Sequence, residues 1–296
     1  MTRDTLTFIF PTMRLGSAEL TLVSDGTIRM DGGSMFGVVP KAIWGRMRPA
    51  DRRNRVEMGL NCLLIRTAGK NVLVDTGVGT KHSQKVRAIF HMRAGELVGN
   101  LARQGVAPED IDLVVLTHLH FDHAGGCTRY NQQRRLEPVF PRATYLAQRQ
   151  DWQEATETNE RTRPAYLPED FMPLAEAGQL ELLDGDTELL PGLWVRRTGG
   201  HSAGHQMVYI ESEGEKAACL GDILPMPQHL PAHYMTAFDM YPLETLEAKR
   251  RWLEQAEKEG WLLVFGHSVD QKMGRLTRRE DGRLSLIHYN VEADLS

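Results

Sequence analysis

The chain of 296 residues is 41% hydrophobic and 25% charged, an ordinary globular composition that excludes a disordered or fibrous protein. Its 35 Lys and Arg against 39 Asp and Glu give a net charge of -4, which argues against a dedicated nucleic-acid-binding surface. The three cysteines suggest no disulfide framework, and no apolar run approaches the roughly 20 residues that span a bilayer. We therefore expect a cytoplasmic protein with neither a membrane nor a nucleic-acid partner.

The first part of the chain is predicted to be mainly β-structure. Short runs of branched residues closed by Gly, Asn or Asp predict strands at 6–10 and 19–26 and a hairpin over 61–75. Apolar residues three or four apart then predict a helix over 83–103, which Gly105 ends. The continuous apolar run at 112–116 is typical of a strand covered on both faces.

The second part repeats this rhythm after a segment of different character. Residues 129–178 are polar and are interpreted as a mostly helical insertion around one short strand, 143–146, lying over one end of the sheet. Strands are then predicted at 193–198, 207–211, 216–220 and 261–265, with a helix over 243–259 between Pro242 and Gly260. The pattern predicts two sheets packed face to face with helices outside, in one domain over 1–296 with a cap insertion around 129–178.

The sharpest motif is THLHFDHAGG, which directly follows the strand at 112–116. It contains His118, His120, Asp122 and His123. Alternation along an extended segment places His118 and His120 on one side, while Asp122 and His123 point elsewhere. Four such groups at one strand end are costly to bury unpaired, whereas divalent cations use all of them.

Three later strand ends supply further metal-binding side chains. His201 follows the strand at 193–198, Asp222 the strand at 216–220 and His267 the strand at 261–265. Each lies beside a Gly that lets the backbone turn closely around a site. Each is a weak signal alone, but together with the first motif they fit one site assembled from successive strand ends.

These residues resemble the metallo-β-lactamase superfamily over nearly the whole chain, with HxHxDH matched in full and the later His, Asp and His in the right order. The resemblance implies an α/β protein with a four-layer αββα sandwich. It implies two divalent metal ions, one held by His118, His120 and His201 and the other by Asp122, His123 and His267, with Asp222 bridging both. In HSAGH it assigns the ligand to His201 and not to His205.

The resemblance also implies a mechanism. A bridging hydroxide attacks a carbonyl or a phosphorus centre, and Asp122 carries a proton to the leaving oxygen. Asp75 is expected to orient a ligand histidine. Nitrogen and oxygen ligands without thiolate suit zinc and also accept Mn, Fe or Co.

Longer stretches are similar to the branch of quorum-quenching N-acyl-homoserine lactonases, YtnP-like proteins among them, and methyl parathion hydrolase. They include DGTIRMDGGSMFGVVPKAIWG, RVEMGLNCLLI and GDILPMPQHLPAHYMTAFDMYPLETLEAKRRWL. Known lactonases of this branch carry a Tyr three residues after the bridging Asp, where this chain has Pro225. The branch implies a hydrolase that opens lactones, N-acyl-homoserine lactones among them, or related esters.

Two apolar stretches are candidates for the wall of a substrate-binding pocket. The residues are Phe36, Val39 and Trp44 before the metal motif and Met226, His229 and Phe238 after Asp222. The first three fit hairpin packing equally well, and His229 fits an ordinary surface position.

Other hydrolytic functions stay open. A glyoxalase II-like hydrolase of glutathione thioesters would use basic residues near the C-terminus, where Lys272, Arg275, Arg278 and Arg279 supply charge. An aryl ester or phosphotriester hydrolase is the other alternative. A homodimer is expected because closed two-fold assemblies are the commonest kind.

Overall fold

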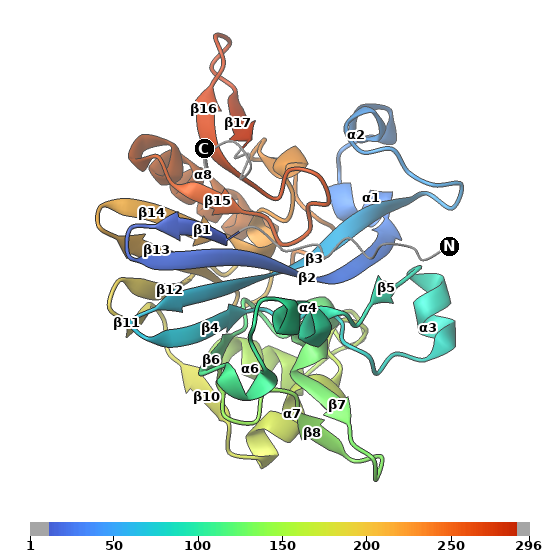
Figure 1. The fold of residues 1–296 in the computed structure, drawn as a ribbon. Coiled ribbons are helices and arrows are strands. Elements are labelled where there is room, and N and C mark those ends of the chain that lie inside the picture. Colours follow the sequence, from blue (N-terminus) through green and yellow to red (C-terminus); the bar gives the residue numbers. More distant parts are fainter. Residues whose placement is uncertain (1–11, 289–296) are drawn as a thin grey trace, which may run out of the picture.

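Two mixed β-sheets form the centre of the molecule in a computed structural model that describes residues 12–288 (Figure 1). The first sheet has the strand order β1-β2-β3-β4-β6-β9-β10, and β5 pairs with β2 beside it. Its strands are β1 (Thr12–Leu15), β2 (Ala18–Asp31), β3 (Arg55–Thr67), β4 (Lys70–Val74), β5 (Arg93–Ala94), β6 (Leu113–Val115), β9 (Thr144–Gln148) and β10 (Leu180–Leu183).

The second sheet is built from consecutive strands of the C-terminal part, in the order β11 to β17. Its strands are β11 (Thr187–Leu190), β12 (Leu193–Arg197), β13 (Gln206–Ser212), β14 (Glu215–Cys219), β15 (Leu262–Val264), β16 (Met273–Arg278) and β17 (Leu284–His288). The β16–β17 hairpin projects from the body of the molecule (Figure 1). A small separate hairpin pairs β7 (Thr128–Tyr130) with β8 (Leu136–Pro138).

Eight α-helices lie within the described range. They are α1 (Gly32–Phe36), α2 (Lys41–Met47), α3 (Gln84–Ile89), α4 (Leu97–Arg103), α5 (Phe121–Ala124), α6 (Arg149–Thr156), α7 (Pro168–Glu176) and α8 (Pro242–Glu259). Short 3-10 turns cover Pro108–Asp110, Gly125–Cys127, Gly221–Ile223 and Pro227–His229. In the described part of the chain, no helix combines the length and the apolar character that a membrane span needs.

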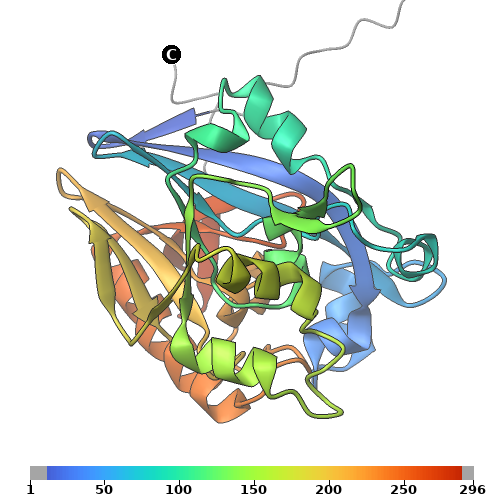
Figure 2. The same cartoon turned by 90° about the horizontal axis from the view of Figure 1, so that it is seen from below.

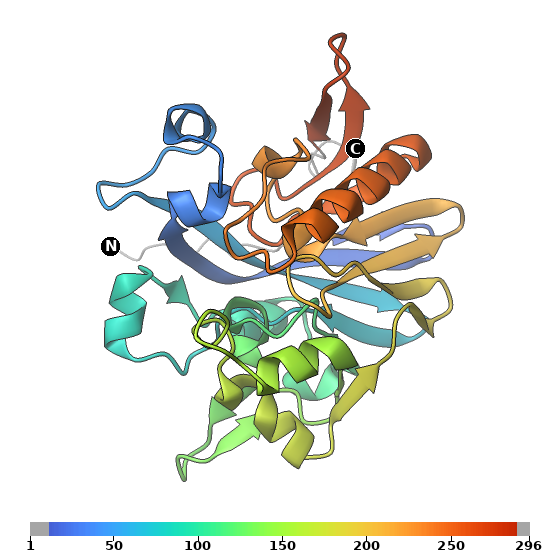
Figure 3. The ribbon, with the colours of Figure 1, turned by 180° about the vertical axis from the view of Figure 1, so that it is seen from behind.

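The layers follow from which faces of the sheets are apolar. Leu63 of β3 and Val208 of β13 belong to a core that fills the space between the two sheets. The outer face of the first sheet packs on α4 and α7, with Leu101 and Phe171 buried there. The outer face of the second sheet packs on α8 through Trp252. The result is the four-layer αββα sandwich, with α8 on one side and α4, α6 and α7 on the other (Figures 2 and 3).

The hairpin expected over 61–75 is confirmed. β3 and β4 pair antiparallel from Leu63 opposite Val74 to Thr67 opposite Lys70. Ala68 and Gly69 both have positive φ, 49° and 71°, as a two-residue hairpin turn of the primed type requires. The strand expected at 6–10 lies outside the described residues.

The single helix predicted over 83–103 is wrong, since the structure has α3, β5 and α4 there. Gly95 has φ +97°, which no helix accommodates. The buried carboxylate of Asp25 accepts hydrogen bonds from the backbone N–H of Gly95 at 3.2 Å and of Leu97 at 3.1 Å. β5 at the same time pairs with β2, so the chain leaves the helix to make these contacts.

The segment 129–178 contributes to the sheet as well as covering it. Its strand β9 extends the expected 143–146 and lies between β6 and β10, parallel to both. Its helices α6 and α7 lie on the outer face of that sheet, and it also holds the β7–β8 hairpin except for Thr128. The segment therefore forms part of the sandwich itself.

Candidate metal centre

Seven His and Asp side chains meet at one edge of the two sheets. Two follow β6 on the loop that leads into α5, two lie in α5 itself, and three follow β12, β14 and β15. They are His118, His120, Asp122, His123, His201, Asp222 and His267. β4 and β6 are parallel neighbours, as are β14 and β15, so their carboxyl ends lie at a common edge and bring these loops together.

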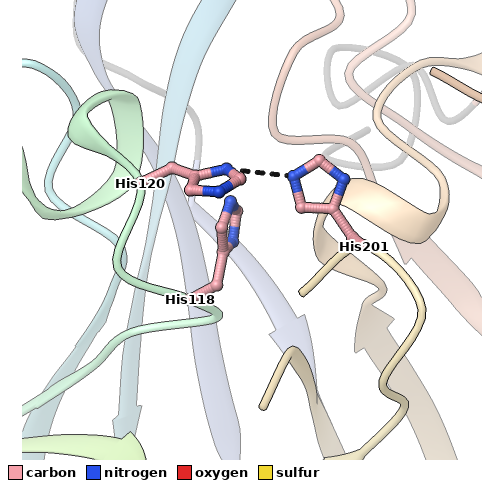
Figure 4. A group of neighbouring side chains, drawn as sticks. All are labelled: His118, His120 and His201. Carbon is pink, nitrogen blue, oxygen red and sulfur yellow. Dashed lines mark hydrogen bonds between the residues drawn. The ribbon is translucent and has the colours of Figure 1, made fainter. Parts of the chain in front are cut away.

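The first group contains three histidines. His118, His120 and His201 each offer a ring nitrogen, and these nitrogens lie within 4.8 Å of one another. His120 Nδ1 is 3.1 Å from His201 Nε2. Figure 4 shows His118 and His120 reaching the site from one loop and His201 from another. All three are buried.

The second group lies beside the first. His123 Nε2 and His267 Nε2 are 3.1 Å apart, and Asp122 Oδ2 is 3.7 Å from His267 Nε2. The two oxygens of Asp222 face different groups: Oδ2 is 3.4 Å from His201 Nε2, and Oδ1 is 3.1 Å from His267 Nε2. The structure thus brings together both sets of residues that the resemblance implied, with Asp222 between them, and His118 also lies close to His123 and Asp222.

Hydrogen bonds on the outer side of three rings determine which nitrogen faces inward. The contacts are His123 Nδ1 to Asp75 Oδ2 at 2.9 Å, His201 Nδ1 to Asp239 Oδ1 at 2.7 Å and His267 Nδ1 to the carbonyl of Gly59 at 2.9 Å. A carbonyl or carboxylate oxygen only accepts, so each Nδ1 carries the proton and donates it. Each Nε2 therefore directs a lone pair into the centre.

This arrangement fits a bound cation. The lone pairs of His123 Nε2 and His267 Nε2 face each other at 3.1 Å, a repulsive contact unless a positive charge lies between them. His118 Nε2 and Asp222 Oδ1 are buried without a hydrogen-bond partner among the described residues. Buried polar atoms are normally paired, and imidazole nitrogens with carboxylate oxygens are a donor set for zinc and related divalent metals.

The electrostatics of the centre favour added positive charge. Burial opposes a charge on His123, yet the carboxylates of Asp222 and Asp75 raise its pKa well above the ordinary value. Burial would likewise raise the pKa of Asp222, but the neighbouring His267 and His123 hold it well below its usual range. Burial together with the adjacent His123 keeps the pKa of His118 well below 6.5. At His123 the neighbouring carboxylates therefore outweigh the cost of burying charge, whereas at His118 they do not.

His205 lies outside the centre, as the resemblance implied. Its Nε2 accepts from the backbone N–H of Asp222 at 2.9 Å, and its Nδ1 contacts Thr198 Oγ1 at 2.5 Å. Gly221 makes this contact possible, because it has φ +53° and an added Cβ would come within 2.5 Å of His205 Nε2. His205 thus holds the turn that carries Asp222.

Asp75 binds His123 as expected, but the corresponding partner of His201 was not found from the sequence. Asp239 lies 38 residues further along the chain and is 4% exposed. Thr236 Oγ1 donates to the same carboxylate oxygen at 3.0 Å. The only sequence signal is an acidic residue in an otherwise apolar stretch, FDMY, after the Asp222 turn.

A pocket of about 390 Å³ opens onto the centre. His120, Asp122, His201 and Asp222 lie at its polar end. Its apolar wall is formed by Met30, Met35, Met58, Phe90, Phe121 and Phe238. Arg161, Pro164 and Ala165 of segment 129–178 line it as well, so part of that segment closes over the site.

Of the six residues expected in the substrate wall, the structure places Phe238 in this wall and the other five elsewhere. Phe36, Val39, Trp44, Met226 and His229 are buried and absent from the pocket lining. Phe36 stacks on Trp44 at 5.2 Å and on His229 at 5.0 Å between ring centroids. Residues 32–47 form α1 and α2 instead of a hairpin, and His229 is fully buried with Nε2 donating to the carbonyl of Met35 at 2.8 Å. These side chains form the core behind the pocket.

Comparison with known proteins gives the family. The model of the metallo-beta-lactamase superfamily matches residues 56–267, which include the whole centre. The chain belongs to this superfamily. Among its relatives is an N-acyl homoserine lactonase of Bacillus thuringiensis, 29% identical over 224 residues that cover 71% of this chain and 82% of the relative. The lactonase AttM of Rhizobium radiobacter is 26% identical over 178 residues, covering 58% of this chain and 64% of AttM.

Solved structures of other proteins share the fold. A probable metal-dependent hydrolase from Staphylococcus aureus is 31% identical, with a TM-score of 0.85 over 94% of this chain and all of that one. AidC, described as a dizinc quorum-quenching lactonase, is 21% identical, with a TM-score of 0.79 over 95% of this chain and 97% of AidC. The superfamily membership agrees with the αββα layers and with a divalent-metal centre.

Proposed function

We propose that this protein is a binuclear metallohydrolase that opens lactones, with N-acyl-homoserine lactones as its substrate class. The proposal rests on one observation: both groups of candidate ligands contribute residues to the polar end of one apolar pocket. The polar end suits a lactone ring, and the methionine and phenylalanine wall suits an acyl chain. The named lactonases among the relatives support the same reaction class.

The seven side chains are proposed as the ligands of two zinc ions. His118, His120 and His201 would hold one ion and Asp122, His123 and His267 the other, with Asp222 shared because its oxygens face both groups. Zinc is favoured by the nitrogen and oxygen donor set. When bound, the ions would polarise a carbonyl and lower the pKa of water to about 7, which supplies a nucleophile at neutral pH.

The chain itself supplies the proton transfer and the orientation of the substrate. Asp122 is only partly buried, lines the pocket and lies beside His267, so it is placed to carry a proton to the leaving alkoxide. Phe121 and Phe238 would hold the acyl chain and keep water from the reacting carbonyl. Because Pro225 stands at the position of the lactonase tyrosine, this position offers no hydroxyl to polarise the carbonyl.

The placement of the basic C-terminal residues disfavours a glutathione-thioester hydrolase. Arg278 and Arg279 line a separate cavity of about 800 Å³ between α8 and the β16–β17 hairpin. Arg275 donates to the carbonyl of Gly260. None of these three residues borders the pocket at the metal centre, so they are not positioned to bind the carboxylates of glutathione there.

The test is a substrate panel on zinc-loaded protein. It contains N-acyl-homoserine lactones of several chain lengths, simple lactones, aryl esters, a phosphotriester and a glutathione thioester. We expect the highest kcat/KM for an acyl-homoserine lactone, whereas turnover of the thioester alone would overturn the proposal.

Variants link the activity to the centre. His120→Ala should lose the zinc ion of its own group, and Asp222→Ala should weaken the binding of both ions. Each variant should also lose at least 100-fold in kcat/KM, on the order seen when ligand environments are disrupted. His233→Ala is the matched control, since His233 is exposed and outside the centre. Full activity in either ligand variant would contradict the assignment.

The proposal includes a cytoplasmic homodimer. All three cysteines are buried free thiols, which suits a reducing compartment. Light scattering on the purified protein measures the molecular mass, and a mass near 67 kDa, twice the 33.4 kDa chain, is the expected result.

A further inference from the structure

One buried carboxylate joins the two loops that carry the three-histidine group. Asp151 lies in the first turn of α6 and is fully buried, with 0% of its surface exposed. Its Oδ2 accepts a hydrogen bond from the backbone N–H of Leu119 at 2.6 Å. Its Oδ1 accepts from the hydroxyl of Ser202. Neither atom of Asp151 belongs to the metal groups described above.

The two partners of Asp151 flank the histidines. Leu119 lies between His118 and His120, and Ser202 directly follows His201. The carboxylate therefore bridges the two loops from which these rings reach the site in Figure 4. A change in this bridge would alter the distance between the rings that one metal ion must bind together.

Further contacts hold α6 against the second loop. Gly204 packs so closely that an added Cβ would come within 2.2 Å of the backbone nitrogen of Asp151. Glu154 Oε2 accepts from the backbone N–H of Ala203 at 2.7 Å. The strand ends below are joined separately, because the N–H of Gln206 donates to the carbonyl of Thr117 at 2.9 Å. Asp151 thus connects the two loops that carry the candidate ligands, whereas the strand ends are joined without it.

We propose that Asp151 is a positioning residue that sets the separation of His118 and His120 from His201 and so determines the affinity of that one metal group. The inference rests on the proposed two-ion site. The other group has its own supports, Asp75 for His123 and the Gly59 carbonyl for His267, and no described contact with Asp151. Loss of Asp151 should therefore affect the two ions unequally.

The first experiment measures zinc affinity by competition with a chromophoric chelator in the full-length protein. Asp151→Ala removes both hydrogen bonds and should lower the binding affinity for one of the two zinc ions by about 10- to 100-fold. This is the usual cost of losing a residue that orients a ligand. Asp151→Asn keeps an acceptor for Leu119 N–H and an amide donor for Ser202 Oγ, so it should restore the affinity to within about threefold. An Asn variant as weak as the Ala variant would overturn the bridging role.

A second comparison identifies which ion is affected. In a His267→Ala background, where the three-histidine group is intact, adding Asp151→Ala should lower the affinity of the remaining ion. In a His120→Ala background, which leaves Asp122, His123 and His267, the same change should have no effect. An equal loss of zinc affinity in both backgrounds would mean that the variant loosens the whole centre, and it would overturn the proposal.

Asp25→Asn is the matched control for loss of a buried carboxylate. Asp25 is 1% exposed and accepts from backbone N–H groups in loops that carry no proposed ligand, so this variant should lose stability but keep both ion affinities within twofold. If Asp151→Ala does not fold, Ser202→Ala removes one of the two bonds, and unchanged affinity there would overturn the inference. A wild-type chain that binds fewer than two ions would instead overturn the proposed function.

Discussion

At the scale of single residues, the centre depends on fixed histidine tautomers. Asp75, Asp239 and the Gly59 carbonyl each accept a hydrogen bond from the Nδ1–H of one ring, so three Nε2 lone pairs point to the same space. Such outer partners raise the basicity of the ring and fix its orientation. They therefore contribute to metal binding through the rings that they hold.

Asp239 gives the clearest test of this point. Asp239→Ala removes the acceptor of His201 Nδ1, so the ring loses its orientation and its tautomer preference. We expect zinc affinity to fall about 10- to 100-fold, while Asp239→Asn, which keeps an acceptor oxygen, falls less. Chelator competition measures both. Asp184→Ala on the surface is the control, and an Asp239→Ala variant with wild-type affinity would contradict the role.

Metal-binding residues within a short motif were easier to predict than hydrogen-bond partners that lie far away in the sequence. The HxHxDH spacing and the strand-end positions indicated the seven convergent side chains, because strand ends meet at a common edge. Asp239 could not be found, since nothing in its own segment points to His201. The wall residues were misplaced because a Phe or Trp has the same pattern whether it lines a pocket or fills the core behind it.

At the scale of elements, α8 supports the loop that covers the centre. Lys249 of α8 is 1% exposed, and its Nζ donates to the carbonyls of His229 at 2.6 Å, Pro231 at 3.1 Å and Tyr234 at 2.5 Å. The same loop continues to Phe238 in the pocket wall and to Asp239. The helix thus anchors a segment that contributes to both the pocket and the ring of His201.

The buried ammonium gives a dependence of stability on pH. Burial lowers the pKa of Lys249 to about 7 from 10.5. Between these values the unfolded chain binds more protons at this site than the folded chain, so the free energy of unfolding rises with pH. From pH 7 to 9 the wild type should gain about 2 kcal/mol relative to Lys249→Met. Urea unfolding at both pH values measures this, with exposed Lys258→Met as control; a difference that does not change with pH would contradict it.

Helix boundaries show why a local sequence pattern is not sufficient to predict where an element begins and ends. The apolar spacing over 83–103 fits one helix, but Asp25 and β2 compete for the backbone of residues 93–97. Those partners lie about 70 residues earlier in the chain. The helix over 242–259 was predictable because Pro242 and Gly260 mark its ends locally, and Gly260 adopts the left-handed conformation, φ 66°, of a helix end.

At the scale of the whole molecule, the centre joins the two sheets. Four of the seven side chains follow the first sheet's strand β6, and three follow strands of the second sheet. The two-sheet architecture was predictable because continuous and alternating apolar strands occur in both halves. The pocket was not, since it is made by segments as distant as β2, the loop around Arg161 and the loop around Phe238.

Metal removal should therefore weaken the whole fold. Ions that bind the folded chain and not the unfolded one add about 2.7 kcal/mol each at a free concentration 100 times Kd. We expect chelation to lower the Tm by several degrees, and zinc to restore it. The Tm of Asp222→Ala, which lacks the shared ligand, should respond far less to either treatment; an equal response would show that the stabilising ions bind elsewhere.

The order of the seven residues along the chain has a consequence for synthesis. His118 to His123 are made early, but His267 comes only after β15. A growing or truncated chain that ends before this point has no complete centre, even if its first sheet has already folded. Hydrolytic activity is thus confined to molecules translated past His267, and the turnover of a preparation reports how many of its chains extend beyond that residue.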